Sequence, residues 1–366
     1  MKKITLSILA VASIVSAQSD IELLKSQMDE MAKKIAKLEE KKAKGNTELV
    51  TKSLKLKVSG KHYLGFVSTT DELTDDTTND FETRKNYFDV KAYFKEDSKS
   101  YFRTTFDTTH KGDGDWDIRL KYAYLYLNNI LPYTGVELGQ AHRPWIDFEQ
   151  HNGWHYRSIS KVFLETHEGA HLTNSADIGI NFKTKTPYFS SELGIFNGEG
   201  YHGVEDGEGL SAEWRLTAHL FGNGKKKPHN IDTYANISFI GQMNDDSNGH
   251  ENEDLNWYGI HAVYNQPEFL IATQYIKTDK ANAKYAGEGY SINGEARFGD
   301  FITLGRYDHF ELDANNEEKD RGIVGVAYKY NKNIEFVANF MNEKVEDITG
   351  TTTDENSLMV TAEINW

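Results

Sequence analysis

The sequence predicts an all-β protein: a 16-stranded antiparallel transmembrane β-barrel that follows a short N-terminal α-helical coiled coil. After about residue 50, apolar and polar residues alternate with the period of two that is typical of strands with one apolar face. The connections between these segments tend to alternate between short and long, as in barrels with tight turns at one rim and loops at the other. An even number of strands brings both ends of the barrel to the same rim.

Residues 1–17 are expected to be a secretory signal peptide. Lys2 and Lys3 precede a largely apolar run that ends at Val15, and the small residues Ser16 and Ala17 follow it. The apolar run is shorter than the roughly 20 residues that a membrane-spanning helix needs. We therefore expect cleavage before Gln18 and export of the mature chain.

Residues 18–44 are predicted to form a periplasmic coiled coil. Its apolar residues recur at spacings of three and four, which puts them on the a and d positions of heptads; they are Ile21, Leu24, Met28, Met31, Ile35 and Leu38. A single helix cannot bury so narrow an apolar seam alone. We favour a parallel trimer over packing of the helix against its own barrel. A linker, residues 45–53, follows and contains Gly45.

The predicted barrel, residues 54–366, contains sixteen alternating segments. They cover residues 54–68, 84–95, 100–109, 116–127, 134–141, 175–184, 188–196, 211–221, 231–243, 256–265, 268–278, 288–298, 301–310, 321–330, 333–344 and 356–366. The last segment alternates up to its final residue, as the closing strand of an outer-membrane barrel does. The long connections are 69–83, 142–174, 197–210, 244–255, 311–320 and 345–355.

Aromatic residues stand near the lower end of seven of the eight segments that run toward the short turns. They are Phe94, Tyr126, Phe182, Tyr264, Phe298, Tyr330 and Trp366. We expect them to face outward at one membrane interface, because aromatic rings gather at headgroup depth.

The opposite parity carries charges of both signs and predicts a water-filled interior. Unpaired charges in a packed core would cost several kcal/mol each. The basic residues of the predicted lumen wall are Arg103, Arg119, Lys121, Arg215, Arg297 and Arg306. The formal net charge of −15 argues against a nucleic-acid partner. No motif in the chain indicates a cofactor.

The longest connection, residues 142–174, is predicted to fold into the barrel and narrow it. Its candidate constriction residues are His142, Arg143, Asp147, Glu149, Arg157 and Lys161. Opposite them, the predicted lumen wall is locally basic, so opposed charges would set a field across the passage. The sequence leaves open whether anions or cations pass more easily.

One segment matches a zinc-peptidase motif formally: His167, Glu168, Gly169, Ala170 and His171 read H-E-x-x-H. That motif needs a helix to bring both imidazoles to one face. Gly169 weakens a helix, and the chain soon enters a predicted strand, so we expect neither catalysis nor a metal site here. The absence of cysteine also excludes thiolate sites and cysteine nucleophiles.

The stretch KYAYLYL at 121–127, followed by VELGQAHRPW at 136–145, resembles the phosphate-selective O/P-type porin family. The resemblance implies a trimeric 16-stranded channel in the outer membrane of a Gram-negative bacterium, narrowed by the loop after this segment. It also implies contact with membrane lipid and lipopolysaccharide, and a coil in the periplasm that could reach peptidoglycan. Only nine arginines occur in the chain, so phosphate specificity is not carried over.

The expected function is passive diffusion of ions and small hydrophilic solutes, with charge selectivity set by the inward-folded loop. The alternative is a surface adhesin or structural barrel whose acidic loops bind a partner or cations. An enzyme barrel ranks third. Conductance through the lumen separates the first two.

Overall fold

The computed structural model describes residues 47–50, 54–110, 114–203, 209–244, 255–313, 318–346 and 352–366. The expected signal peptide and the predicted coiled coil, from Ile21 to Leu38, lie outside these residues, and so does most of the predicted linker.

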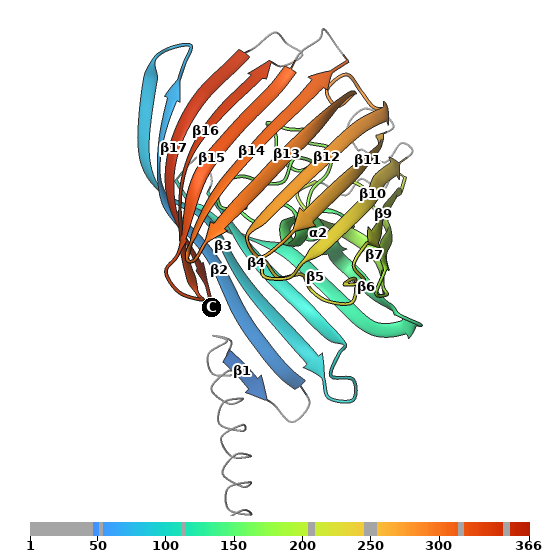
Figure 1. Ribbon diagram of the computed structural model, residues 1–366. Helices are drawn as coiled ribbons and strands as arrows, with labels where there is room; N and C mark the ends of the chain where they lie inside the picture. Colours follow the sequence, from blue (N-terminus) through green and yellow to red (C-terminus); the bar gives the residue numbers. More distant parts are fainter. Residues whose placement is uncertain are drawn as a thin grey trace, which may run out of the picture. The chain divides into compact units, whose positions relative to one another are not determined.

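The described chain consists almost entirely of strands. They are β1 (Thr47–Val50), β2 (Leu54–Asp71), β3 (Asp76–Phe94), β4 (Tyr101–His110), β5 (Trp116–Leu131), β6 (Thr134–His142), β7 (Ala176–Lys185), β8 (Phe189–Phe196), β9 (Ser211–His219), β10 (Tyr234–Asn244), β11 (Asn256–Asn265), β12 (Phe269–Lys280), β13 (Gly287–Phe298), β14 (Phe301–Leu312), β15 (Glu318–Lys329), β16 (Ile334–Glu346) and β17 (Thr352–Asn365). A short helix, α2 (Ile146–Asn152), lies inside the ring of strands (Figure 1). No helix among the described residues is both long and apolar enough to cross a membrane.

Strands β2 to β17 form one closed antiparallel ring. Each pairs with its neighbours in sequence, and the ring closes where β17 pairs with β2. The closing pairs run from Glu355 opposite Asp71 to Asn365 opposite Lys61. Closure satisfies the backbone hydrogen bonds of every strand internally, which the membrane interior requires. The predicted fold class and number of barrel strands are thereby confirmed.

The first predicted loop, residues 69–83, is mostly strand. Pairing between β2 and β3 continues to Asp71 opposite Asp76, so only a tight turn separates them. The predicted loop 345–355 is shortened in the same way, since β16 ends at Glu346 and β17 begins at Thr352. Such strand ends can be polar on both faces because both meet water, and they then show no apolar period to recognise.

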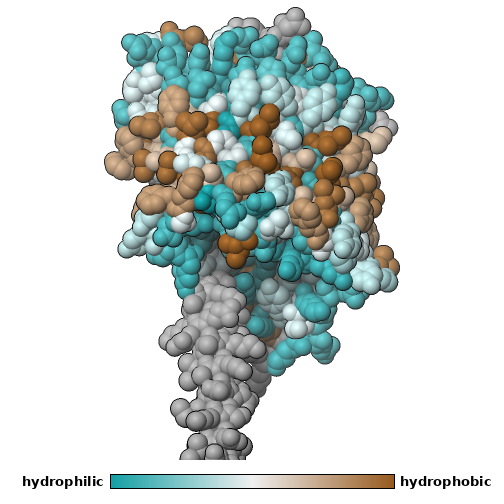
Figure 2. Space-filling view, in the orientation of Figure 1, coloured by the Kyte–Doolittle hydropathy of each residue, from teal (hydrophilic) through white to brown (hydrophobic). Residues whose placement is uncertain are grey.

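Outward-facing side chains alternate with buried ones along the strands. On β17, Leu358 and Val360 are exposed while Met359 and Thr361 are buried. Figure 2 shows the apolar side chains of one face gathered in a band, with hydrophilic residues above and below it. Such a band is the lipid-facing surface of a transmembrane barrel.

A bulge in β5 reverses this alternation. Thr105 of β4 pairs with Tyr122 while Phe106 pairs with Leu120, which leaves Lys121 as the extra residue. Beyond it Tyr124 and Tyr126 point inward and line an internal cavity. The prediction that Tyr126 faces lipid is therefore wrong, because a strict period of two cannot anticipate an inserted residue.

An apolar core fills part of the interior, contrary to the prediction of a water-filled interior without a packed core. Residues between β6 and β7 pack against inward-facing side chains from β10 to β17. The core comprises Trp145, Ile146, Trp154, Tyr156, Ile159, Val162, Phe163, Leu164, Ala170, Leu172, Ile240, Leu255, Trp257, Ile276, Ile302, Leu304, Phe310, Leu312, Ile323, Ala327, Val337, Met341 and Met359. The loop thus has an apolar face that fixes it inside the barrel.

Replacing Phe163 by alanine should loosen this packing. Phe163 is fully buried, and its ring centroid lies 6.2 Å from that of Phe310. We expect a loss of about 3–5 kcal/mol in the local stability of the loop, measured by urea titration of tryptophan fluorescence. The barrel should keep its far-ultraviolet spectrum. The outward-facing Phe239→Ala is the control, and equal shifts in both variants would refute a packed inner loop.

Candidate functional site in the barrel lumen

The connection between β6 and β7, residues 143–175, is called the inner loop below. It runs across the inside of the barrel and is tied to several strands. Asn236 donates from Nδ2 to Asn152 Oδ1 (3.0 Å), Asn293 donates to the Gly153 carbonyl (3.1 Å), and Arg321 donates to Thr166 Oγ1 (2.9 Å). The strands that hold it extend from β10 to β15, so the loop covers one side of the inner wall.

Gly153 permits a close approach between the loop and this wall. A Cβ atom there would lie 3.0 Å from Nε2 of His261, which points inward from β11. The His261 ring also packs edge-on against Trp145, with ring centroids 5.0 Å apart. A side chain at residue 153 would therefore push the end of α2 away from the barrel.

Arg143 is a buried anchor at the start of the inner loop. Its Nε donates to both carboxylate oxygens of Glu213 on β9, at 2.8 and 3.0 Å, and Nη2 donates to Gln242 on β10 at 2.8 Å. Only 3% of the residue is exposed. The constriction role predicted for Arg143 does not fit this burial.

Glu149 is equally buried and accepts a hydrogen bond from the Trp145 indole at 2.6 Å. Burial raises the pKa of this carboxyl to about 7, although Arg306 and the indole hydrogen bond act in the opposite direction. Glu149 therefore belongs to the packing of the loop, and its predicted place at the constriction does not fit either. Asp147 and Glu149 stand two residues apart, and the sequence pattern could not distinguish them. In the structure, α2 turns the two carboxyl groups to different sides.

Asp147 and His142 lie beside the internal cavity instead. The Asp147 side chain is 47% exposed, and one of its oxygens lies 4.0 Å from His142 Nε2. The His142 ring packs against Tyr122 in a tilted arrangement with centroids 4.3 Å apart, and its Nδ1 lies 3.1 Å from Glu137. Arg103 completes this group with Nη1 3.0 Å from His142.

Arg157 and Lys161 face the wall formed by β3 and β5. Arg157 pairs with Glu165 at 2.5 Å and lies within electrostatic range of Tyr87 on β3. Lys121 of β5 lies within electrostatic range of both Arg157 and Lys161, and its Nζ sits 4.8 Å from the centre of the Tyr87 ring. The inner loop thus reaches from the strands that hold it, β10 to β15, to β3 and β5 on the opposite side of the barrel.

The residues predicted for the lumen wall divide into two groups. Arg103, Arg119 and Lys121 lie on the side facing the inner loop, and Arg119 Nη2 is 3.3 Å from Asp107. Arg215 and Arg306 are buried beneath the inner loop and donate to its backbone, at Pro144 and Lys161 respectively.

Arg297 binds a different segment, the turn between β9 and β10. Its Nη1 donates to the Asn230 carbonyl at 2.9 Å. Arg215, Arg297 and Arg306 therefore point inward as predicted, but they serve as internal ties.

A cavity of about 460 Å³ lies beside the inner loop at the short-turn rim. Sequence reasoning missed several of its basic residues: Lys183, Lys185, Lys226 and Lys227. Three consecutive lysines, Lys225 to Lys227, were visible in the sequence. Nothing in the sequence showed that two of them point toward the lumen.

The H-E-x-x-H segment forms turns and not a helix, and His171 adopts a positive φ of 51°. The two histidine rings lie 5.3 Å apart. Glu168 accepts from Thr166 and lies 3.5 Å from Arg321, so this carboxylate is engaged in holding the loop. The helical geometry that zinc peptidases need is missing at this segment.

Removing the arginine of the buried anchor should destabilise the inner loop strongly. In Arg143→Met, the Glu213 carboxylate stays buried without its partner, which costs about 3–5 kcal/mol. The double variant Arg143→Met/Glu213→Gln should recover much of this loss. Urea titrations of both would show it, and additive losses in the double variant would rule out a coupled anchor.

The stability of the inner loop should fall as the pH rises through Glu149. This carboxyl has a pKa of about 7 in the folded protein, above its usual 4.5. The folded state therefore holds the extra proton between these values, and stability is lost as the pH rises from about 4.5 to 7. Glu149→Gln should flatten this part of the profile in urea titrations. An unchanged slope would contradict the assignment.

The structure is similar to several solved outer-membrane proteins. An anion-selective porin from Comamonas acidovorans has a TM-score of 0.62 and 12% identity, covering 85% of this chain and 99% of that one. The trimer form of OmpT from Vibrio cholerae gives 0.57 and 13%, covering 85% and 99%. OmpF of Salmonella typhi, solved with daunomycin, gives 0.58 and 12%, covering 87% and 100%. At such low sequence identities, the similarity shows a common fold only.

No curated protein sequence matches the chain. The family model described as Gram-negative porin matches residues 5–348, most of its length. The resemblance noted in the sequence thus holds at the level of porins in general, and the match does not extend to the phosphate-selective subtype. With its closed barrel and internal loop, the chain belongs to the Gram-negative porin family and forms an outer-membrane channel for passive diffusion.

Proposed function

We propose that diffusion through this channel is charge-selective, and that the inner loop sets the selectivity together with the wall of β3 to β5. The observation that carries the proposal is that the loop is tied to the strands on one side of the lumen and brings its charges close to β3 and β5 on the other. Arg306 on β14 donates to the Lys161 carbonyl at 2.9 Å, and Arg157 lies within electrostatic range of Tyr87 on β3. In this proposal solutes pass beside the loop, and the channel is narrowest there.

The charges along this passage are mixed but predominantly basic. Lys161 extends from the loop and Arg119 from β5, and the largely buried Arg157 and Lys121 add positive charge nearby. Glu165 and Asp107 offset part of this charge through their pairs with Arg157 and Arg119. Fixed charges at the narrowest ring decide which ions pass.

For the assembly, we propose a homotrimer. The related fold of Vibrio cholerae OmpT occurs in a trimer form, and the heptads between Ile21 and Leu38 suit a three-stranded coil in the periplasm. Contacts of the barrel with lipid and lipopolysaccharide, and of the coil with peptidoglycan, belong to the same proposal. The resemblance of residues 121–145 to phosphate-selective porins remains a prediction about this segment.

Substituting Lys161 by alanine should shift the ion preference toward cations. One charge about 10 Å away in water attracts an anion and repels a cation by about 0.4 kcal/mol each, which changes the anion-to-cation permeability ratio roughly fourfold. The measurement is the reversal potential of the reconstituted protein in a planar bilayer under a salt gradient. Conductance steps in threes would support the trimer.

The matched control is Lys277→Ala, which removes the same charge from the outward face of β12. Equal reversal potentials for the two variants would place the selectivity elsewhere. If the folded barrel conducted no current, the adhesin or structural alternative would replace the channel.

A further inference from the structure

The turn between β9 and β10, residues 220–233, is held firmly at the short-turn rim of the barrel. Asn265 Nδ2 on β11 donates to the backbone carbonyls of Asn230 and Asp232, at 3.2 and 2.5 Å. Arg297 on β13 donates to the Asn230 carbonyl as well. Gly224 donates its backbone N–H to the Pro187 carbonyl at 2.8 Å. These contacts fix the position of the lysines that the turn carries.

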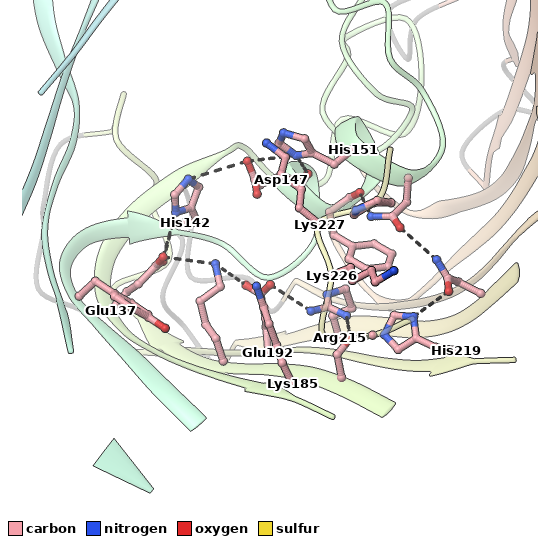
Figure 3. Close-up of a pocket in the computed structure, with 18 of the residues that line it drawn as sticks. Glu137, His142, Asp147, His151, Lys185, Glu192, Arg215, His219, Lys226 and Lys227 are labelled. Atoms are coloured by element: carbon pink, nitrogen blue, oxygen red, sulfur yellow. Dashed lines mark hydrogen bonds and ion pairs between the residues drawn. The ribbon is translucent and has the colours of Figure 1, made fainter. Parts of the chain in front are cut away.

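Two of those lysines line the cavity of about 460 Å³ beside the inner loop. Figure 3 shows Lys226 and Lys227 entering the same pocket as Lys185 and Arg215. Seven cationic side chains line it against three carboxylates; the cations are Lys91, Arg103, Lys183, Lys185, Arg215, Lys226 and Lys227, and the carboxylates are Glu137, Asp147 and Glu192.

Two of the three carboxylates are already neutralised within the wall. Lys183 lies 3.3 Å from Glu137 and 3.1 Å from Glu192, and Arg215 lies 3.0 Å from Glu192. Arg103 is paired in turn with Asp89 at 2.5 Å. These groups form the framework of the pocket and leave little net charge for a solute.

The remaining cations have no carboxylate of their own. Within the described part of the chain, Lys91, Lys185, Lys226 and Lys227 form no ion pair, and Asp147 is the carboxylate left to face them. Burial lowers the pKa of Lys227, and the neighbouring cations Lys61, Lys57 and Arg103 lower it further while Asp147 opposes them. The unpaired lysines thus lie close together in a cavity that water and solutes can enter.

We propose that this cavity binds small divalent oxyanions, such as sulfate, phosphate or a short dicarboxylate, as they pass through the channel. The inference deepens the proposed charge selectivity and rests on the channel function. The four unpaired lysines exceed Asp147 by three charges, which favours a dianion over a monovalent anion, and the volume admits a small solute with some of its water. Asn223 lines the same cavity, and its side-chain amide offers a neutral hydrogen-bond donor for a further oxygen.

A binding site inside the pore should make divalent oxyanions compete with chloride. In a planar bilayer with potassium chloride, added sulfate should reduce the single-channel current in a saturable way. Lys227→Gln should raise the half-blocking sulfate concentration roughly fourfold, the factor for one charge about 10 Å from a dianion in water. Lys226→Gln should act in the same direction.

Lys225→Gln is the matched control. It removes the same charge from the same turn, but Lys225 lies outside the cavity, with its Nζ 5.2 Å from the centre of the Tyr133 ring. Its half-blocking concentration should stay at the wild-type value. The proposal is overturned if Lys225→Gln and Lys227→Gln give the same shift, or if sulfate does not block the wild-type channel.

Succinate and phosphate distinguish the kinds of oxyanion. Stronger block by succinate would assign the site to dicarboxylates, and stronger block by sulfate and phosphate would assign it to tetrahedral anions. Because half-blocking concentrations are measured independently of the reversal potential of Lys161→Ala, failure of either proposal can be recognised separately. If the protein does not conduct, calorimetric titration of the detergent-solubilised protein with sulfate decides, and binding equal in wild type and Lys227→Gln refutes the site.

Discussion

The packing of the inner loop against the inward-facing side chains of β10 to β17 is the interaction on which the interior of this barrel depends. Large side chains such as Trp154 and Phe163 meet inward-facing residues such as Phe310, so a segment that could have been an external loop is kept inside. Burial of apolar area supplies most of the stabilisation of such contacts. Without this packing, the loop would not occupy the lumen, and the charged side chains of the wall would face only water.

The buried charges follow from that packing. Arg143, Arg306 and Arg321 lie where the loop meets the strands, and each is paired with a carboxylate or a backbone carbonyl. A buried ion pair contributes little net stability, but losing one partner is expensive. These pairs therefore act mainly by fixing the position of the loop, and they remove most arginines from the set of groups that a solute could meet.

What remains accessible are mainly lysines and a few acids at two levels of the lumen. Lys161 lies where the loop approaches β3 and β5, and Lys226 and Lys227 lie at the short-turn rim. The two levels belong to different segments of the chain. A solute would meet them in succession, so selection at the narrow level and retention at the rim can be altered separately.

The sequence by itself determined the class of fold, the number of barrel strands and the course of the longest connection. Alternation along strands and the spacing of turns are local properties, and a closed barrel follows when strands pair with their neighbours in sequence. The sequence also indicated which charges point inward, except beyond Lys121, where one inserted residue reverses the parity.

Only the tertiary structure decided which inward charges are free. Arg143 and Glu149 look like pore residues in the sequence, but both are buried. Arg143 pairs with Glu213, which is distant in sequence, and Glu149 bonds Trp145 one helical turn away. The reverse holds for Lys226 and Lys227, which look like part of a solvated turn and instead line a cavity. Burial and pairing depend on which segments meet in space, and the periodicity of a single strand carries no information about that.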